Sequence, residues 1–161
     1  MNQLVFRDAV PGDAGRVLWF VRALAEYEKL LHEVTATEAD LDRSLFGTPA
    51  RCQALFVEQV GVQVGFALWL YNYSTFAGRH GLYVEDVFVL PEHRGNGIGT
   101  RIFSELARRA LAQGCVRMEW SVLDWNAPAI RFYRGIGARA MDDWTVQRLT
   151  GDALTAMAAR G

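Results

Sequence analysis

Two adjacent carboxylates, Glu85 and Asp86, stand just before a glycine-rich segment. Residues 84–107 run from an apolar strand through a proline and the string RGNGIG at residues 94–99 into an amphipathic stretch. A glycine-rich turn at a helix N-terminus presents unpaired backbone N–H groups, and the helix dipole adds positive potential. The segment therefore predicts a turn that binds a phosphorylated cofactor, with carboxylates facing whatever reacts with that cofactor.

The glycine turn differs from two common phosphate-binding motifs. No Lys-Ser or Lys-Thr pair follows the glycines, as a Walker loop requires. Gly95 and Gly97 fit the first two positions of a dinucleotide fingerprint, but the third falls on Thr100, and a long N-terminal half precedes the unit. The form that fits is R-x-x-G-x-G, in which the glycines let the backbone approach a pyrophosphate, and Arg94 and Arg101 add positive charge.

Alternating strands and helices must position these groups. Hydrophobic periodicity predicts strands at residues 4–7, 53–58, 63–73, 80–90, 115–122 and 138–149. Helices are predicted at residues 14–31, 37–47, 97–112, 129–136 and 152–159. Residues 60–62 are predicted to turn a hairpin, and residues 72–78 to form a loop. Hairpins at one end and strand–helix units at the other predict a mixed sheet with helices on both faces, in a single domain of residues 1–161.

Local signals mark the helix ends. Thr37 and Asp40 have the spacing of a capping box, and Gly114 and Gly137 suit the residue after a helix C-terminus. Asn126 lies just outside the helix that Pro128 begins, so it can cap that helix, bind the cofactor, or do both.

Composition excludes several classes of protein. Apolar residues make up 51% and charged residues 22% of the 161, which is ordinary globular composition. A net charge of −1 gives no broad electrostatic reason to bind nucleic acid or a membrane. Cys52, Cys115 and the three histidines lack the spacing of a metal site, so no metal is expected. We see no secretory signal or membrane-spanning stretch and expect two free thiols in a cytoplasmic protein.

The glycine string resembles the acetyl-CoA pyrophosphate loop of the GCN5-related N-acetyltransferases (GNAT). Residues 83–89 (YVEDVFV), residues 123–126 (LDWN) and the pair Phe132-Tyr133 are similar to the diamine (spermidine/spermine) and thialysine branch of that family. The resemblance runs from the first strand to Trp144. It implies an α/β (α+β) fold with a mixed, mostly antiparallel twisted sheet, acetyl-CoA as co-substrate without a metal, and a homodimer.

The resemblance also implies roles for individual residues. Glu85 matches the base or water-relay residue, and Tyr133 matches the general acid. Amine-binding positions are matched by Tyr27, Glu28, Glu85, Asp86 and Trp144. Cofactor-binding positions are matched by Phe88, Val89, Arg94, Gly95, Asn96, Gly97, Ile98, Gly99, Thr100, Asn126 and Tyr133.

Elementary chemistry is consistent with these roles. An alkylamine titrates near about 10 and arrives protonated, so a carboxylate can attract it and relay its proton. Because Glu85 and Asp86 are neighbours on a strand, their side chains are expected on opposite sheet faces, one toward substrate and one toward a structural partner. A strand-end salt bridge is the alternative for either carboxylate. For Tyr133 the alternative is a half-buried core tyrosine beside Phe132.

The acceptor is less well defined. In the resembling polyamine enzymes the loop matching residues 72–78 carries an acidic residue and a tryptophan, where this chain has Ser74 and Phe76. We therefore expect a small primary amine, such as a short diamine or a lysine-like amino acid, to accept the acetyl group by direct attack on the thioester. The alternatives are a protein or peptide N-acetyltransferase and a non-catalytic acyl-CoA-binding regulatory domain. The presence of Glu85, Asn126 and Tyr133 together argues against the last.

Overall fold

The computed structural model describes residues 3–161 and contains two compact units, Met1–Asp124 and Trp125–Gly161. The single domain predicted for residues 1–161 stays a prediction.

The N-terminal unit is built on one five-stranded sheet whose strands follow chain order. Its strands are β1 (Leu4–Asp8), β2 (Gln53–Gln59), β3 (Val62–Ser74), β4 (Arg79–Val89) and β5 (Met118–Glu119). The first four pair antiparallel, and β5 pairs parallel with β4. This confirms the predicted mixed, mostly antiparallel sheet.

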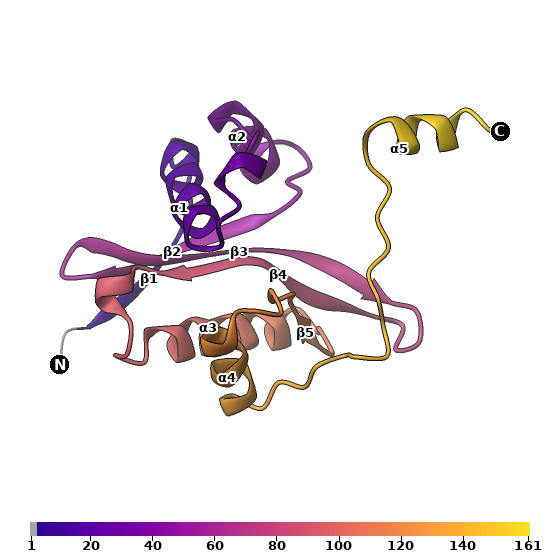
Figure 1. The fold of residues 1–161 in the computed structure, drawn as a ribbon. Helices are drawn as coiled ribbons and strands as arrows, with labels where there is room; N and C mark the ends of the chain where they lie inside the picture. Colours follow the sequence, from indigo (N-terminus) through magenta and orange to yellow (C-terminus); the bar gives the residue numbers. More distant parts are fainter. Residues whose placement is uncertain (1–2) are drawn as a thin grey trace. The chain divides into compact units, whose positions relative to one another are not determined.

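Helices cover both faces of this sheet, as predicted (Figure 1). Helices α1 (Ala14–Tyr27) and α2 (Glu38–Phe46) lie on one face, and α3 (Ile98–Ala112) lies on the other. Two short 3-10 turns, η1 (Leu31–Glu33) and η2 (Pro91–His93), connect them to the rest of the unit. The sheet is therefore the middle layer between two separate cores.

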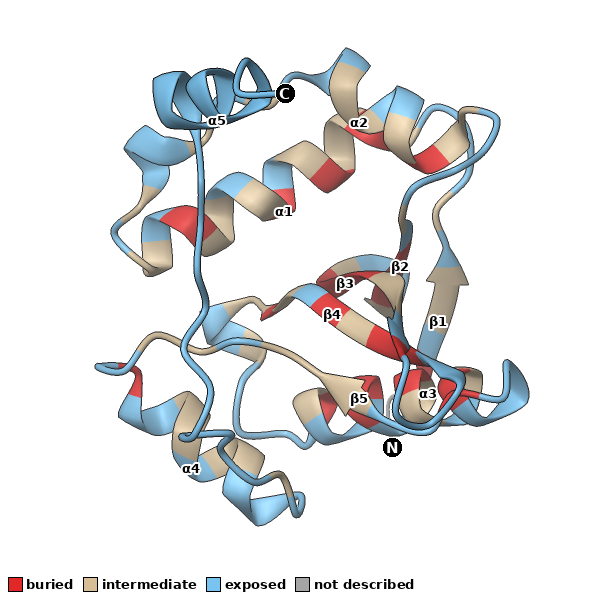
Figure 2. Ribbon diagram, turned by 90° about the vertical axis from the view of Figure 1, so that its right-hand side faces the viewer, coloured by how far each residue is buried: buried red, intermediate tan, exposed pale blue. Residues whose placement is uncertain are grey.

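The two cores explain the apolar periodicity of the helices. Under α1, the rings of Phe20 and Phe66 stack with centroids 5.0 Å apart, and Phe56 packs against Phe20. Under α3, Ile102 and Leu106 pack against the opposite face of the sheet. Buried residues accordingly recur along α1 and α3 (Figure 2).

Several predicted boundaries are confirmed. Thr37 and Asp40 form the capping box of α2, and Gly114 follows α3 with a left-handed φ of 71°. The β2–β3 hairpin turns at Val60 and Gly61, both with positive φ, as a tight two-residue hairpin requires. The next hairpin is longer than predicted, because β3 continues to Ser74 and leaves only residues 75–78 in the turn.

Two strand predictions are wrong: the strand at residues 115–122 is shorter than predicted, and the strand at residues 138–149 does not form. Only Met118–Glu119 of the predicted strand 115–122 pairs with the sheet, because it lies at the edge and meets a partner on one side only. The C-terminal unit contains α4 (Ala127–Gly135) and α5 (Gly151–Ala158), as predicted, but the residues between them form neither helix nor strand. The alternation at residues 138–149 suits a strand, yet no strand in residues 3–161 pairs with it.

Among the described residues, no helix combines the length and apolar character needed to cross a membrane.

Candidate active site

The site begins with an irregularity in the pairing of β3 and β4. Leu68 lies opposite Asp86 and Trp69 lies opposite Val84, so Glu85 is an extra residue in β4. Such an insertion is a β-bulge, which bends the strand and changes the direction of its side chains.

The bulge reverses which residues of β4 face each core. Leu82 and Val84 pack in the core under α3, whereas Phe88 packs in the core under α1. The α1 side of the sheet therefore receives odd-numbered side chains before the bulge and even-numbered ones after it. This places both Glu85 and Asp86 on the α1 side. The expectation that they point to opposite faces is wrong, because strict alternation holds only in a regular strand.

A third carboxylate, Glu28, completes a cluster on this side of the sheet. Burial, followed by the charges of Glu85 and Glu28, raises the pKa of Asp86 to about 7. Burial also raises the pKa of Glu28, which is half-buried. The charges of Glu85 and Glu28 therefore both act on Asp86, and we refer to the three carboxylates as the carboxylate cluster.

The end of α1 positions Glu28. The helix stops at Tyr27, four residues earlier than predicted, because Lys29 adopts a left-handed φ of 62° and the Leu30 N–H donates to the Ala25 carbonyl. Glu28 is the C-cap residue of the helix, and its own N–H donates to the Leu24 carbonyl at 2.9 Å. The early stop thus presents Glu28 at the edge of the core under α1.

The carboxylates of the cluster take no part in the ion pairs that arginine and histidine form in the described residues. Among residues 3–161, no arginine or histidine forms an ion pair with Glu28, Glu85 or Asp86. This contradicts the alternative of a strand-end salt bridge. Gathering carboxylates without a cation costs free energy, so the arrangement suits an added cationic group.

The glycine turn follows the same strand. Gly95 and Gly97 have φ values of 80° and 73°, and an added Cβ at either residue would meet nothing within 4 Å. Glycine is therefore required for backbone conformation and not for space. Helix α3 starts at Ile98 with no side-chain cap and no acidic residue in its first turn. An uncapped helix N-terminus with open backbone fits an anionic group such as the predicted pyrophosphate.

The Arg94 side chain lies toward α1. Its Nε donates to the Val89 carbonyl at 2.9 Å, and its Cζ lies 4.5 Å from the Tyr27 ring centroid and 5.1 Å from that of Phe88. Tyr27 also packs against Phe88, with ring centroids 6.2 Å apart. The predicted cofactor residue Arg94 thus contacts three other predicted site residues, Val89, Tyr27 and Phe88.

The remaining predicted residues belong to the C-terminal unit. Asn126 caps α4 by accepting the Ala129 N–H at 3.3 Å, and it is buried. Tyr133 is half-buried on the same helix, with its ring 5.5 Å from that of Phe132. Trp144 is 73% exposed in the irregular segment before α5. The roles of these residues toward cofactor and amine stay predictions.

The turn used to infer the acceptor lies at the other end of β4. Ser74 pairs with Arg79, six residues before Glu85, which is about 20 Å along a strand. The Ser74 hydroxyl accepts the Ala77 N–H at 3.2 Å, and Phe76 is 97% exposed. Within one chain, Ser74 is therefore not a neighbour of the carboxylates, and its identity says little about the amine.

One neighbour of the site was missed from sequence. Cys52 is half-buried, and burial, then Asp86 and then Glu85 raise the pKa of its thiol. It immediately precedes β2, two strands away from β4, so only the order of strands in the sheet could have revealed it.

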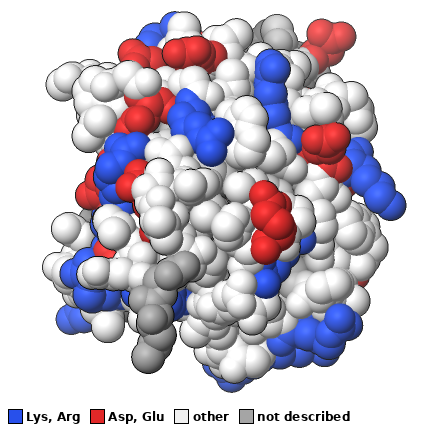
Figure 3. All heavy atoms as spheres, turned by 90° about the vertical axis from the view of Figure 1, so that its left-hand side faces the viewer, with Lys and Arg blue, Asp and Glu red and all other residues white. Residues whose placement is uncertain are grey.

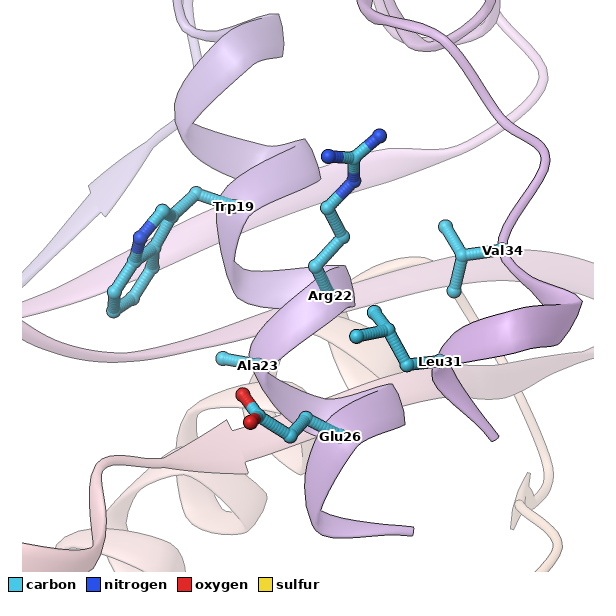
Figure 4. Close-up of a pocket in the computed structure, with 6 residues that line it drawn as sticks. All are labelled: Trp19, Arg22, Ala23, Glu26, Leu31 and Val34. Atoms are coloured by element: carbon cyan, nitrogen blue, oxygen red, sulfur yellow. The ribbon is translucent and has the colours of Figure 1, made fainter. Parts of the chain in front are cut away.

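Other features lie outside the predicted site. A pocket beside α1 is lined by Trp19, Arg22, Ala23, Glu26, Leu31 and Val34, none of which is a predicted site residue (Figure 4). On the face drawn in Figure 3, acidic and basic residues are interspersed. Residues 3–161 contain no group of three or more His, Cys, Asp or Glu arranged to hold a metal ion.

The pH dependence of the free energy of unfolding should reflect the environment of Asp86. The folded protein retains the Asp86 proton up to about pH 7, whereas the unfolded chain loses it near about pH 4, so this carboxyl destabilises the fold as pH rises between these values. We expect Asp86→Asn to gain stability over wild type, with the gain growing by about 2 kcal/mol from about pH 5 to about pH 8. Urea unfolding across this range measures the gain.

The matched control is Asp42→Asn on the exposed surface of α2. Its difference from wild type should not vary with pH over this range. An equally constant difference for Asp86→Asn would contradict the buried, coupled environment.

Comparisons with known proteins agree with this architecture. The sequence model of the Acetyltransferase (GNAT) family matches residues 20–138. Thialysine N-epsilon-acetyltransferase from Sus scrofa is 37% identical over 171 residues, which cover 99% of this chain and 100% of the relative. L-ornithine N5-acetyltransferase from Arabidopsis thaliana is 29% identical, covering 94% of this chain and 86% of that one.

Among solved structures, an integron cassette protein of V. cholerae matches with a TM-score of 0.79 at 23% identity, covering 96% of this chain and 97% of that one. At this identity the likeness concerns the fold alone. Taken with the family match and the full-length relatives, it shows that the chain belongs to the GNAT acetyltransferase family.

Proposed function

We propose that this protein transfers the acetyl group of acetyl-CoA to a primary amine of a small molecule. The observation that carries the proposal is the cluster of Glu28, Glu85 and Asp86, which forms no ion pair with an arginine or histidine of the described residues. An ammonium group is the ligand that such a cluster attracts, and family membership supplies the reaction class.

The glycine turn is the proposed cofactor site. Backbone N–H groups of Gly95, Asn96, Gly97, Ile98, Gly99 and Thr100 would face the pyrophosphate of CoA, supported by the dipole of α3. The backbone of Phe88 and Val89 would lie beside the rest of the cofactor, and Asn126 and Tyr133 would complete the site. When bound, acetyl-CoA supplies the acetyl group as a thioester.

The carboxylates have distinct proposed roles. An alkylamine must lose a proton before its nitrogen can attack, and Glu85, exposed at the bulge, accepts that proton directly or through water. Asp86 and Glu28, both partly buried, attract and orient the ammonium group. Tyr133 donates a proton to the leaving thiolate, since a phenol, with a reference pKa near about 10, still carries its proton at neutral pH. Tyr27 and Trp144 border the amine.

The proposed acceptor is a short diamine or a lysine-like amino acid. Two relatives over most of the chain are named for thialysine and L-ornithine, both amino acids with a side-chain amine. We also propose a cytoplasmic homodimer. Its support is the exposed apolar side chains of Trp144, Val146 and Leu149, which a second copy would cover. The runner-up function is acetylation of a protein or peptide amine.

Release of free thiol from acetyl-CoA across a panel of amines tests the proposed function. We expect short diamines and lysine analogues to exceed spermine in kcat/KM, because three carboxylates match one or two ammonium groups and not a long polycation. Turnover of peptides alone would favour the runner-up function. Tight CoA binding with no thiol release from any amine would show a non-catalytic domain.

The Tyr133→Phe substitution tests the acid. We expect kcat to fall by about 100-fold while the Kd of acetyl-CoA changes by less than about 2-fold, because only proton donation is removed. Tyr73→Phe is the matched control, since Tyr73 is a half-exposed tyrosine of the β3–β4 hairpin. Unchanged turnover of the Tyr133 variant would remove this residue from the acid role.

A further inference from the structure

Arg94 joins three parts of the N-terminal unit. It follows η2 and opens the glycine turn, yet its guanidinium lies over the rings of Tyr27, at the end of α1, and Phe88, in β4. Its Nε donates to the Val89 carbonyl, which fixes the plane of the guanidinium group. Arginine suits this position because its planar, delocalised cation stacks on aromatic faces while donating in its own plane.

The two rings under Arg94 adjoin the carboxylate cluster. Tyr27 directly precedes Glu28, and Phe88 shares the α1 side of β4 with Asp86. Contact between Tyr27 and Phe88 therefore sets the distance between the two elements that carry Glu28 and Asp86. Because Lys29 leaves the helical conformation, no further helical turn holds Glu28 in place.

From these contacts we infer that Arg94 is a positioning residue for the amine: it clamps Tyr27 onto Phe88 and thereby holds Glu28 beside Asp86. A contact between its side chain and the cofactor pyrophosphate would have to use the Nη groups, because Nε already donates to Val89 and the guanidinium face lies on the two rings. In this assignment the backbone of the glycine turn faces the cofactor, while the Arg94 side chain serves the acceptor. The expected effect on amine kinetics rests on the proposed function, whereas the contacts that form the clamp do not depend on it.

Kinetics separate the two roles of Arg94. With acetyl-CoA saturating, Arg94→Ala should raise KM for the best amine by about 5-fold, while the Kd of CoA measured by calorimetry changes by less than about 2-fold. Arg94→Lys keeps the charge but lacks the planar group, so it should behave like the alanine variant. A phosphate-binding role predicts the opposite pattern: weaker CoA binding in Arg94→Ala, partial rescue by lysine and an unchanged KM for the amine. That pattern would overturn the inference. An Arg94→Ala variant that weakens CoA binding and amine binding equally would overturn it too.

A double-mutant cycle tests the contact itself. Tyr27→Ala and Arg94→Ala should be non-additive in KM for the amine, because either change alone opens the clamp. Additive effects would mean that Arg94 acts independently of Tyr27 and would contradict the clamp. Arg22→Ala is the control, since it removes an exposed arginine from the same helix, outside the predicted site.

Hydrogen exchange provides a readout that needs no turnover. In Arg94→Ala the backbone amides of residues 28–34 should exchange faster than in wild type, whereas Arg22→Ala should leave them unchanged. Unchanged exchange in the Arg94 variant would refute the clamp. If exchange increases but wild type acetylates no amine, the clamp exists and the proposed function fails, so the two failures are distinguishable.

Discussion

The extra residue in β4 determines the chemistry of this face of the sheet. In regular pairing, Glu85 and Asp86 would point to opposite faces and each would need its own partner. The bulge turns both toward α1, where Glu28 already stands. Bringing like charges together in a partly buried place is unfavourable for the empty protein, so the cluster is an arrangement that a bound cation improves. The fold tolerates that cost because two cores, one on each face of the sheet, hold β4 in place.

Two further features make the cluster useful. The early end of α1 at Tyr27 brings Glu28 to the sheet, and the glycine turn places an uncapped helix N-terminus after the same strand. The segment thus attracts opposite charges at two points. The carboxylates at the bulge of β4 attract cations, and the open backbone N–H groups beyond the end of the strand attract anions. Arg94 lies between them in sequence and contacts both the strand and α1. In the proposed function, an anionic cofactor and a cationic acceptor would therefore bind at different ends of one short segment.

The sequence predicted those features that depend on neighbouring residues. The glycine after α3 at Gly114, the capping box at Thr37 and the N-cap of α4 at Asn126 each follow from local backbone and side-chain chemistry. The bulge at Glu85 could not be predicted, because it exists only relative to the pairing of β4 with β3. The same limit explains the predicted strand at residues 138–149: alternation describes a segment able to pair, but a strand also requires a partner. Cys52 was missed for the same reason, because its position near the carboxylates depends on the order of β2, β3 and β4 in the sheet.

The central claim is that the three carboxylates together bind a cation. Within this cluster, Asp86 is expected to lose its proton near neutral pH. Calorimetry of a short diamine binding to the CoA-saturated protein, repeated in buffers with different ionisation enthalpies near about pH 7, counts the protons exchanged on binding. The account predicts net proton release to the buffer, because an ammonium group beside Asp86 favours its charged form. Binding with no change in protonation, or with proton uptake, would contradict it.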